Sequence, residues 1–98
     1  MPTYELPDSV YAEYAKLSRE QRRAFRRALA RFIEALRHHP ARLPSTLRVK
    51  GVEGHPGVFE MSFAADGRAT FEYGEEVQPG EPHVIWRRVG DHSIFRRP

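Results

Sequence analysis

The hydrophobic pattern of this 98-residue chain changes its period once, between Pro40 and Pro44. Before these prolines, apolar residues recur every three or four positions, which is the spacing of one face of an α-helix. After them, apolar and polar residues alternate, as in a strand with one buried face. Proline cannot donate the hydrogen bond that a helix interior needs, so the pair ends the helical region. The chain is therefore predicted to form helices first and a sheet second, an α+β fold in one domain spanning residues 1–98.

Two antiparallel helices are predicted in the first half of the chain. The first should run from about Pro7 to Leu17, with proline in its first turn and Asp8 at its positive end. Ser18 and Gln21 match a capping box, in which each side chain accepts a hydrogen bond from a free main-chain amide, so a second helix should begin there. Its apolar stripe should face the sheet, and consists of Phe25, Leu29, Phe32, Ile33 and Leu36.

The sheet should be small, twisted and mainly antiparallel, with both helices on one face. An extended segment at residues 3–6 precedes the helices, and strands are expected over residues 47–50, 58–64, 68–73 and 83–89.

The hairpin between the second and third of these strands is predicted to have a three-residue loop, Ala65–Gly67. Glycine at the end of such a loop adopts a positive φ at little cost. This register places Glu60 opposite Glu72 and separates polar from apolar side chains. The polar face, away from the helices, should then carry Glu60, Ser62, Arg68, Thr70 and Glu72.

The formal net charge of +3 hides an uneven distribution. Residues 19–50 contain ten basic and two acidic residues, whereas residues 1–18 and 51–98 each carry an acidic excess. Of the 16 basic residues, 14 are arginine, whose planar side chain binds phosphate through two parallel hydrogen bonds. A polyanionic partner accounts for this arrangement, and so does an ordinary solvated helix face.

The composition excludes several kinds of site. The chain has no cysteine, which excludes disulfide scaffolds, cysteine-ligated zinc and thiol catalysis. Its five histidines show none of the spacings of a helical metal site, so we expect no metal and no small-molecule cofactor. No apolar run approaches the roughly 20 residues of a membrane helix, and the N-terminus lacks a signal-peptide apolar region. We therefore expect a cytoplasmic protein that does not bind membranes.

Two features of the strand region could support catalysis. Arg68 is predicted on a sheet face among carboxylates and hydroxyls, which is either a surface ion-pair cluster or a site. His55 and His92 both lie in glycine-bounded turns, and histidine is the side chain whose ordinary pKa of about 6.5 suits proton transfer at neutral pH. Taken singly, each histidine is better explained as a surface residue.

The last third of the chain resembles a known family. The strand that ends in Gly90, followed by His92 and the aromatic Phe95, is similar to the C-terminal half of RelE-type toxins in the RelE/ParE superfamily of bacterial toxin–antitoxin systems. Arg68 falls where those toxins have an arginine in the sheet. The order of elements is similar over the whole chain, including the two N-terminal helices.

The resemblance implies a ribosome-dependent mRNA endonuclease, in which a ribose 2′-hydroxyl attacks the adjacent phosphate of the A-site codon. By this comparison, Arg68 holds the phosphate and His92 acts as the general acid. Phe95 matches a terminal aromatic that stacks on an mRNA base, a contact worth roughly 1–3 kcal/mol.

The general base stays open among three residues. Glu60 occupies a strand position that is a lysine in RelE, so a carboxylate could act as the base here. His55 lies in a loop where YafQ-like members keep a further catalytic residue. Asp66 is the third candidate, because an acidic residue near this turn occurs in the same members.

The resemblance also implies partners, namely a cognate antitoxin protein and the ribosome, with contacts to rRNA and A-site mRNA. Lys50, Arg23 and Arg27 should contact phosphates without sequence preference. Arg87 and Arg88 should lie on opposite sides of the last strand, so that only one of them, taken here as Arg87, faces the RNA.

Two other functions fit the same fold. One is a ParE-like toxin that inhibits gyrase and has no nuclease activity, and the other is a non-catalytic module that binds RNA or a protein partner. ParE-type chains generally lack the histidine and the terminal aromatic, so His92 and Phe95 favour the nuclease.

Overall fold

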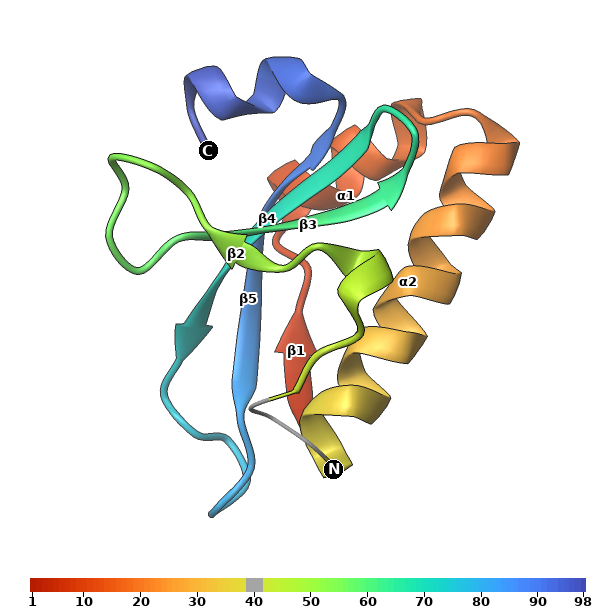
Figure 1. Cartoon of the computed structure of the whole chain (residues 1–98). Coiled ribbons are helices and arrows are strands. Elements are labelled where there is room, and N and C mark those ends of the chain that lie inside the picture. The colour runs from red at the N-terminus through yellow and green to blue at the C-terminus, as the bar shows by residue number, and fades with distance from the viewer. Residues whose placement is uncertain (39–41) are drawn as a thin grey trace.

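A five-stranded mixed sheet with a long helix across one face makes up the protein (Figure 1). The computed structural model describes residues 1–38 and 42–98, and the predicted helix end at Pro40 lies outside them. The elements are β1 (Thr3–Glu5), α1 (Asp8–Lys16), α2 (Arg19–His38), the 3-10 turn η1 (Ser45–Leu47), β2 (Lys50–Gly51), β3 (Phe59–Ala64), β4 (Gly67–Gly74), β5 (His83–Gly90) and the 3-10 helix η2 (His92–Arg96).

The strands lie in the order β1-β5-β4-β3-β2, and this arrangement confirms the predicted α+β fold. β1 pairs with β5 in parallel, and every other neighbouring pair is antiparallel. The N-terminal segment therefore crosses to the far side of the last strand before the helices begin.

The start of α2 follows from the predicted capping box. The Gln21 amide donates to Ser18 Oγ at 3.1 Å, and the Ser18 amide donates to Gln21 Oε1 at 3.3 Å. These two bonds satisfy amides that have no partner within the helix, so the chain leaves α1 and enters α2 at a defined residue.

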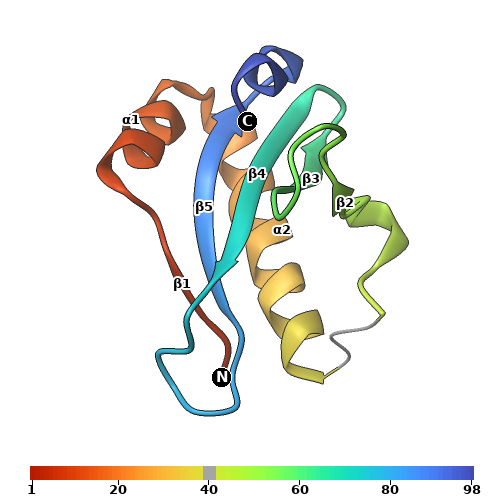
Figure 2. The same cartoon turned by 90° about the vertical axis from the view of Figure 1, so that its left-hand side faces the viewer.

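The core lies between α2 and the sheet. All five residues of the predicted stripe are buried. The ring of Phe32 packs 4.9 Å from Phe71 and 5.9 Å from Trp86, and Phe25 packs edge-on to Trp86 at 5.4 Å. Edge-on contacts of this kind stabilise the packing beyond the area that they bury. One helix thus provides most of the apolar cover on this face (Figures 1 and 2).

The β3–β4 loop is shorter than predicted. Ala64 pairs with Gly67, so the loop consists of residues 65 and 66 only. Gly67 does not have the positive φ that a three-residue loop needs. Position 67 favours glycine for a different reason: the Cβ of any other residue would lie 2.5 Å from Cε2 of the Phe63 ring.

A bulge in β3 compensates for the residue that the loop lacks. The register of β3 shifts between Ser62 and Ala64, which gives this strand one extra residue. The bulge restores the separation of faces that a two-residue loop would otherwise lose. Glu60 therefore lies opposite Thr70, and the predicted pairing of Glu60 with Glu72 is wrong.

The predicted strand over residues 47–50 is also wrong at its start. Leu47 ends η1, and Arg48 adopts the left-handed conformation with φ 49° and ψ 45°, which no strand residue has. The strand that remains is β2, whose two residues pair with Phe59 and Glu60.

The core makes a direct prediction. Phe32 is fully buried, so the change Phe32→Ala should lower the free energy of unfolding by about 3–5 kcal/mol through lost transfer energy and an unfilled cavity. Urea denaturation followed by circular dichroism measures this value. Val77→Ala, at a position that is 65% exposed, is the control and should change it by no more than about 0.5 kcal/mol. A similar small loss for Phe32→Ala would contradict the proposed core.

Candidate active site

The polar residues of the hairpin lie on the face of the sheet away from α2. Glu60 opposite Thr70 and Ser62 opposite Arg68 share this face, because directly paired residues point to the same side of a sheet. The loop between β2 and β3 and the C-terminal η2 both project from this side (Figure 2). Thr70 in the middle of this face is fully buried, and its hydroxyl has no hydrogen-bond partner among the described residues, whereas Ser62 and Arg68 nearer the β3–β4 loop are partly exposed.

A histidine and a carboxylate meet at the corner of this face. His92, the first residue of η2, is hydrogen-bonded through Nδ1 to Oδ1 of Asp66 in the β3–β4 loop. Both side chains are more than half exposed. A carboxylate that accepts from Nδ1 fixes the orientation of the ring and leaves Nε2 as the nitrogen that can exchange a proton with a ligand.

Phe95 stands beside this pair. Its ring centroid lies 6.1 Å from that of His92, with an angle of 72° between the ring planes. The two residues are three positions apart in η2, where side chains at this spacing lie above one another. The 3-10 geometry thus presents a partly exposed aromatic face next to the histidine.

The Arg68 guanidinium lies at the same loop. Its Nη1 donates to the carbonyls of Ala64, Ala65 and Gly67 at 3.1, 3.3 and 2.9 Å. In the part of the chain that the structure describes, no carboxylate lies within ion-pair distance of it, so its charge is not neutralised. The hairpin therefore holds a positive charge beside Asp66 and His92.

The other candidate bases lie further from the corner. Glu60 is two residue pairs along the strands from Arg68, and its carboxylate is 3.8 Å from Lys50 Nζ and 15% exposed. His55 is exposed in the loop before β3, where its main-chain groups bond to Val52 and Val58. Of the three candidates, Asp66 is the one in contact with His92.

Arg87 and Arg88 both reach the open face, contrary to the predicted alternation. The register of β4 and β5 shifts between Thr70 and Phe71, which leaves Arg87 as an extra residue in β5. A bulge of this kind turns two consecutive side chains to one side. Arg87 is ion-paired with Glu72 at 2.8 Å, and its side chain is 40% exposed.

These two arginines hold the segment that carries His92. Arg87 Nε donates to the main-chain oxygen of Pro98 at 3.0 Å, and Arg88 Nη1 donates to the carbonyl of Arg97 at 2.9 Å. Arg88 also binds the carboxylate of Glu13 in α1 through Nε and Nη2, at 2.8–3.1 Å. The hydrogen bonds that Arg88 donates to the Glu13 carboxylate raise the pKa of Arg88 above its ordinary value.

Glu13 makes structural contacts that the sequence did not reveal. Besides Arg88, its carboxylate accepts a 3.3 Å hydrogen bond from the Val89 amide, at the edge of β5 beyond the end of β1. One side chain thus links α1, β5 and the tail of η2. No spacing rule connects residue 13 with residues 88 and 89, so only the folded chain exposes this role.

The first turn of η2 has its own cap. The Asp91 carboxylate accepts a hydrogen bond from the Ser93 amide at 2.8 Å. Hydrogen bonds from the side chain and main chain of Ser93 hold the pKa of Asp91 below its ordinary 3.8. A Cβ at Gly90 would lie 3.0 Å from Ile94, so η2 also packs closely on the end of β5. These contacts fix where His92 and Phe95 stand.

The remaining predicted RNA-binding residues are exposed. Lys50 lies on β2 beside Glu60, and Arg23 and Arg27 lie on α2. Within residues 1–38 and 42–98, no three acidic or histidine side chains come together as a metal site. Among the same residues, no helix is long and apolar enough to cross a membrane.

The fold has a solved counterpart. The structure of a YoeB/ParE toxin from Agrobacterium tumefaciens superimposes with a TM-score of 0.61 over 94% of this chain and 99% of that chain, at 15% sequence identity. No protein-family model and no curated protein sequence matches the chain. The chain thus has the fold of RelE/ParE-superfamily toxins, as the resemblance implied.

The cap of η2 predicts a pH dependence. Because the folded state lowers the pKa of Asp91, this carboxylate stabilises η2 above its ordinary pKa of 3.8, and the contribution is lost as the pH falls through the lowered value. An NMR titration of the Asp91 carboxyl carbon should give a midpoint below 3.8. Ser93→Ala removes the hydroxyl and should raise the midpoint, whereas an unshifted midpoint in the parent protein would contradict the cap.

Proposed function

We propose that the protein is the toxin of a toxin–antitoxin system and an endoribonuclease that cuts mRNA codons in the ribosomal A site. The observation that carries the proposal is the His92–Asp66 pair, set beside the unneutralised guanidinium of Arg68 and the ring of Phe95. The superposition on a YoeB/ParE toxin supports the toxin assignment. The name YoeB/ParE covers both nuclease-type and gyrase-type toxins, so the proposed activity rests on the side chains of the site.

The chemistry needs three groups around one phosphate. A base removes the 2′-hydroxyl proton, the 2′-oxygen bonds to phosphorus, and the bond to the 5′-oxygen breaks as an acid protonates that oxygen. The products are a 2′,3′-cyclic phosphate and a 5′-hydroxyl. Arg68 suits the phosphate, because its planar fork binds two phosphate oxygens and gains strength as negative charge develops on them. His92 is the acid, through the Nε2 that Asp66 leaves unpaired.

We choose the general base from the contacts that the two candidate carboxylates, Asp66 and Glu60, make in the structure. Asp66 is bonded to His92, so its role is to position the acid, as the aspartate of a catalytic triad positions its histidine. Glu60 faces the same side as Arg68, two residue pairs away from it, and its carboxylate lies 3.8 Å from Lys50 Nζ. Glu60 is therefore the base in this proposal, and His55 is the remaining candidate.

Phe95 and the antitoxin complete the proposal. The partly exposed ring of Phe95 is available to stack on a base of the codon, next to the histidine that acts on its phosphate. A cognate antitoxin neutralises the toxin by covering this face. Arg87 Nε and Nη1 are bonded to the C-terminal tail and to Glu72, so an RNA contact by Arg87 would use its Nη2.

The activity can be tested with purified protein in a cell-free translation reaction. Primer extension on the translated mRNA should show cuts inside codons. His92→Ala should lower the cleavage rate by about 10²–10⁴-fold through loss of the acid, and Arg68→Ala by about 10²–10³-fold through loss of phosphate stabilisation. His38→Ala, which changes an exposed histidine at the end of α2, is the matched control and should cut at the parent rate.

Other outcomes would overturn the nuclease. Intact mRNA with arrested supercoiling by gyrase would indicate the ParE-like toxin, and intact mRNA with normal supercoiling would indicate a non-catalytic module. Parent-level cleavage by a folded His92→Ala protein would remove this residue as the acid.

The different roles proposed for Glu60 and Asp66 predict different pH–rate profiles for their variants. Glu60→Gln should abolish the acid-side limb of the pH–rate profile, because it removes the base. Asp66→Asn should slow cleavage and keep that limb, because it only loosens the His92 ring. Loss of the limb in Asp66→Asn, or in His55→Ala, would assign the base to that residue instead.

A further inference from the structure

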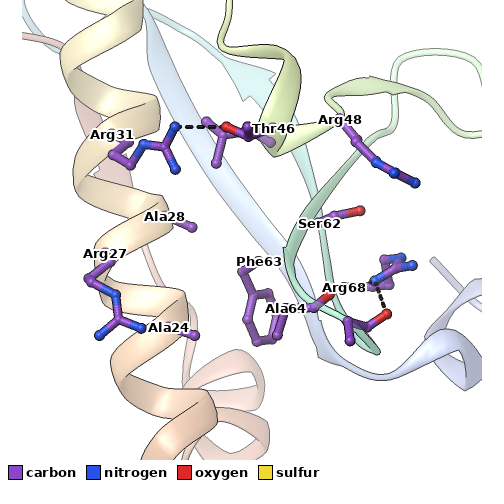
Figure 3. Close-up of a pocket in the computed structure, with 12 residues that line it drawn as sticks. Ala24, Arg27, Ala28, Arg31, Thr46, Arg48, Ser62, Phe63, Ala64 and Arg68 are labelled. Carbon is purple, nitrogen blue, oxygen red and sulfur yellow. Dashed lines mark hydrogen bonds between the residues drawn. The ribbon is translucent and has the colours of Figure 1, made fainter.

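A cleft of about 360 Å³ lies between α2 and the outer part of β3 (Figure 3). Arg27 and Arg31 line it from α2, and Arg48 and Arg68 line it from the other side. The hydroxyls of Thr46 and Ser62 also line it.

The cleft exists because β3 runs past its edge partner. β2 pairs only with Phe59 and Glu60, so the four residues of β3 from Met61 onward have no second strand beside them. The Phe63 ring lies between α2 and this edge, and the helix faces it with the small residues Ala24 and Ala28 (Figure 3). The side chains of the four arginines surround this part of the cleft.

The cleft carries positive charge without compensation. No acidic residue lines it, and within the described residues none of its four arginines has a carboxylate at ion-pair distance. Arg31 donates to Thr46 Oγ1 at 2.7 Å and Arg68 donates to loop carbonyls, all neutral acceptors. Four like charges around one hollow repel one another, and an anion between them removes that repulsion.

The backbone at Arg48 supports a functional role for the cleft. Its φ of 49° lies in the left-handed region, where a side chain costs roughly 1 kcal/mol and glycine fits without strain. Residues held in such conformations are concentrated at binding sites. Here the conformation ends η1 and directs an arginine to the rim of the cleft.

The charge continues along α2 beyond the cleft. Arg19, Arg23, Arg27 and Arg31 recur at every fourth position and are all exposed. Four helical residues rise about 6 Å, so these side chains form a row about 18 Å long. A second hollow of about 600 Å³, lined by Arg19, Glu20, Arg23 and Arg27, adjoins the cleft through the shared Arg27. We call this row, together with Arg48, the arginine track.

We propose that the arginine track binds the phosphate backbone of a single RNA strand and leads it around the edge of β3 to Arg68. A row of cations matches a linear polyanion better than a compact ligand. A protein segment would need apolar anchors to bind stably, and the two hollows are lined mainly by polar groups. The proposal extends the proposed nuclease, since the far end of the track is the residue that holds the scissile phosphate.

The test measures binding without cleavage, so that the two proposals can fail separately. The His92→Ala protein is titrated with a fluorescein-labelled oligomer of twelve uridines, and anisotropy is followed from 50 to 400 mM salt. For single strands, each neutralised phosphate contributes about −0.7 to the slope of log K against log salt. Adding Arg27→Gln, Arg31→Gln and Arg48→Gly should reduce the slope by about 2 and the affinity at 0.1 M salt by about 100-fold.

Two controls keep the result interpretable. Arg37→Gln removes one arginine of α2 outside the track, where it lies 3.9 Å from Glu34, and should leave the slope within error. Arg48→Gly alone should weaken RNA binding while the melting temperature stays unchanged or rises, because glycine relieves the strain.

An unchanged slope in the folded triple variant would overturn the proposal. So would unchanged RNA binding together with lost binding of a labelled ten-residue polyglutamate, since that result would assign the track to an acidic protein segment. If the slope falls as expected but the parent protein cuts no mRNA, the track is supported and the proposed nuclease is not.

Discussion

One helix has to cover a sheet that is wider than itself, and the rest of the structure follows from this mismatch. A helix with its side chains is about 10–12 Å across, whereas five strands at about 4.8 Å spacing span roughly twice that width. The stripe of α2 therefore buries the central strands through Phe32, Phe71 and Trp86 and leaves both edges of the sheet for other elements. At the β5 edge, α1 supplies the Glu13 carboxylate to the Val89 amide and to Arg88. At the β3 edge no such cap forms, and the arginine cleft lies there instead.

The placement of the candidate site also follows from the sheet. Its face away from α2 carries the polar side chains of the hairpin, of which Thr70 is fully buried and Ser62 and Arg68 are partly exposed. Two irregularities then gather those side chains at a corner. The bulge in β3 permits the two-residue loop that carries Asp66, and the bulge in β5 turns Arg87 and Arg88 together toward the tail that carries His92. The site thus depends on two interruptions of the regular alternation.

The sequence correctly predicted the features that follow from a regular spacing of residues. Spacings of three and four identified the buried stripe of α2, and the capping box placed its first residue. Regular alternation also assigned the hairpin residues to the correct faces. The prediction failed wherever one residue breaks a repeat, as at the bulge beside Phe63, at the extra Arg87 and at the left-handed Arg48. Bulges are set by tertiary packing, here by the Phe63 ring over Gly67, which a local pattern does not contain. The contact of His92 with Asp66 joins residues 26 positions apart and required the fold.

The uncapped edge of β3 has a consequence for how the protein behaves in concentrated solution. A strand with an unpaired edge is a template on which another chain can add a strand, and native proteins guard such edges with charge, with bulges or with covering chain. Here the edge of β5 is paired with β1, and beyond the end of β1 the Glu13 carboxylate accepts from the Val89 amide. The outer edge of β3 has a bulge and a set of like charges, and salt screens charges of this kind over about 10 Å at 0.1 M. Self-association through the edge of β3 is thus opposed by charge repulsion. This repulsion weakens as the ionic strength rises, so we expect the protein to associate more readily at high salt.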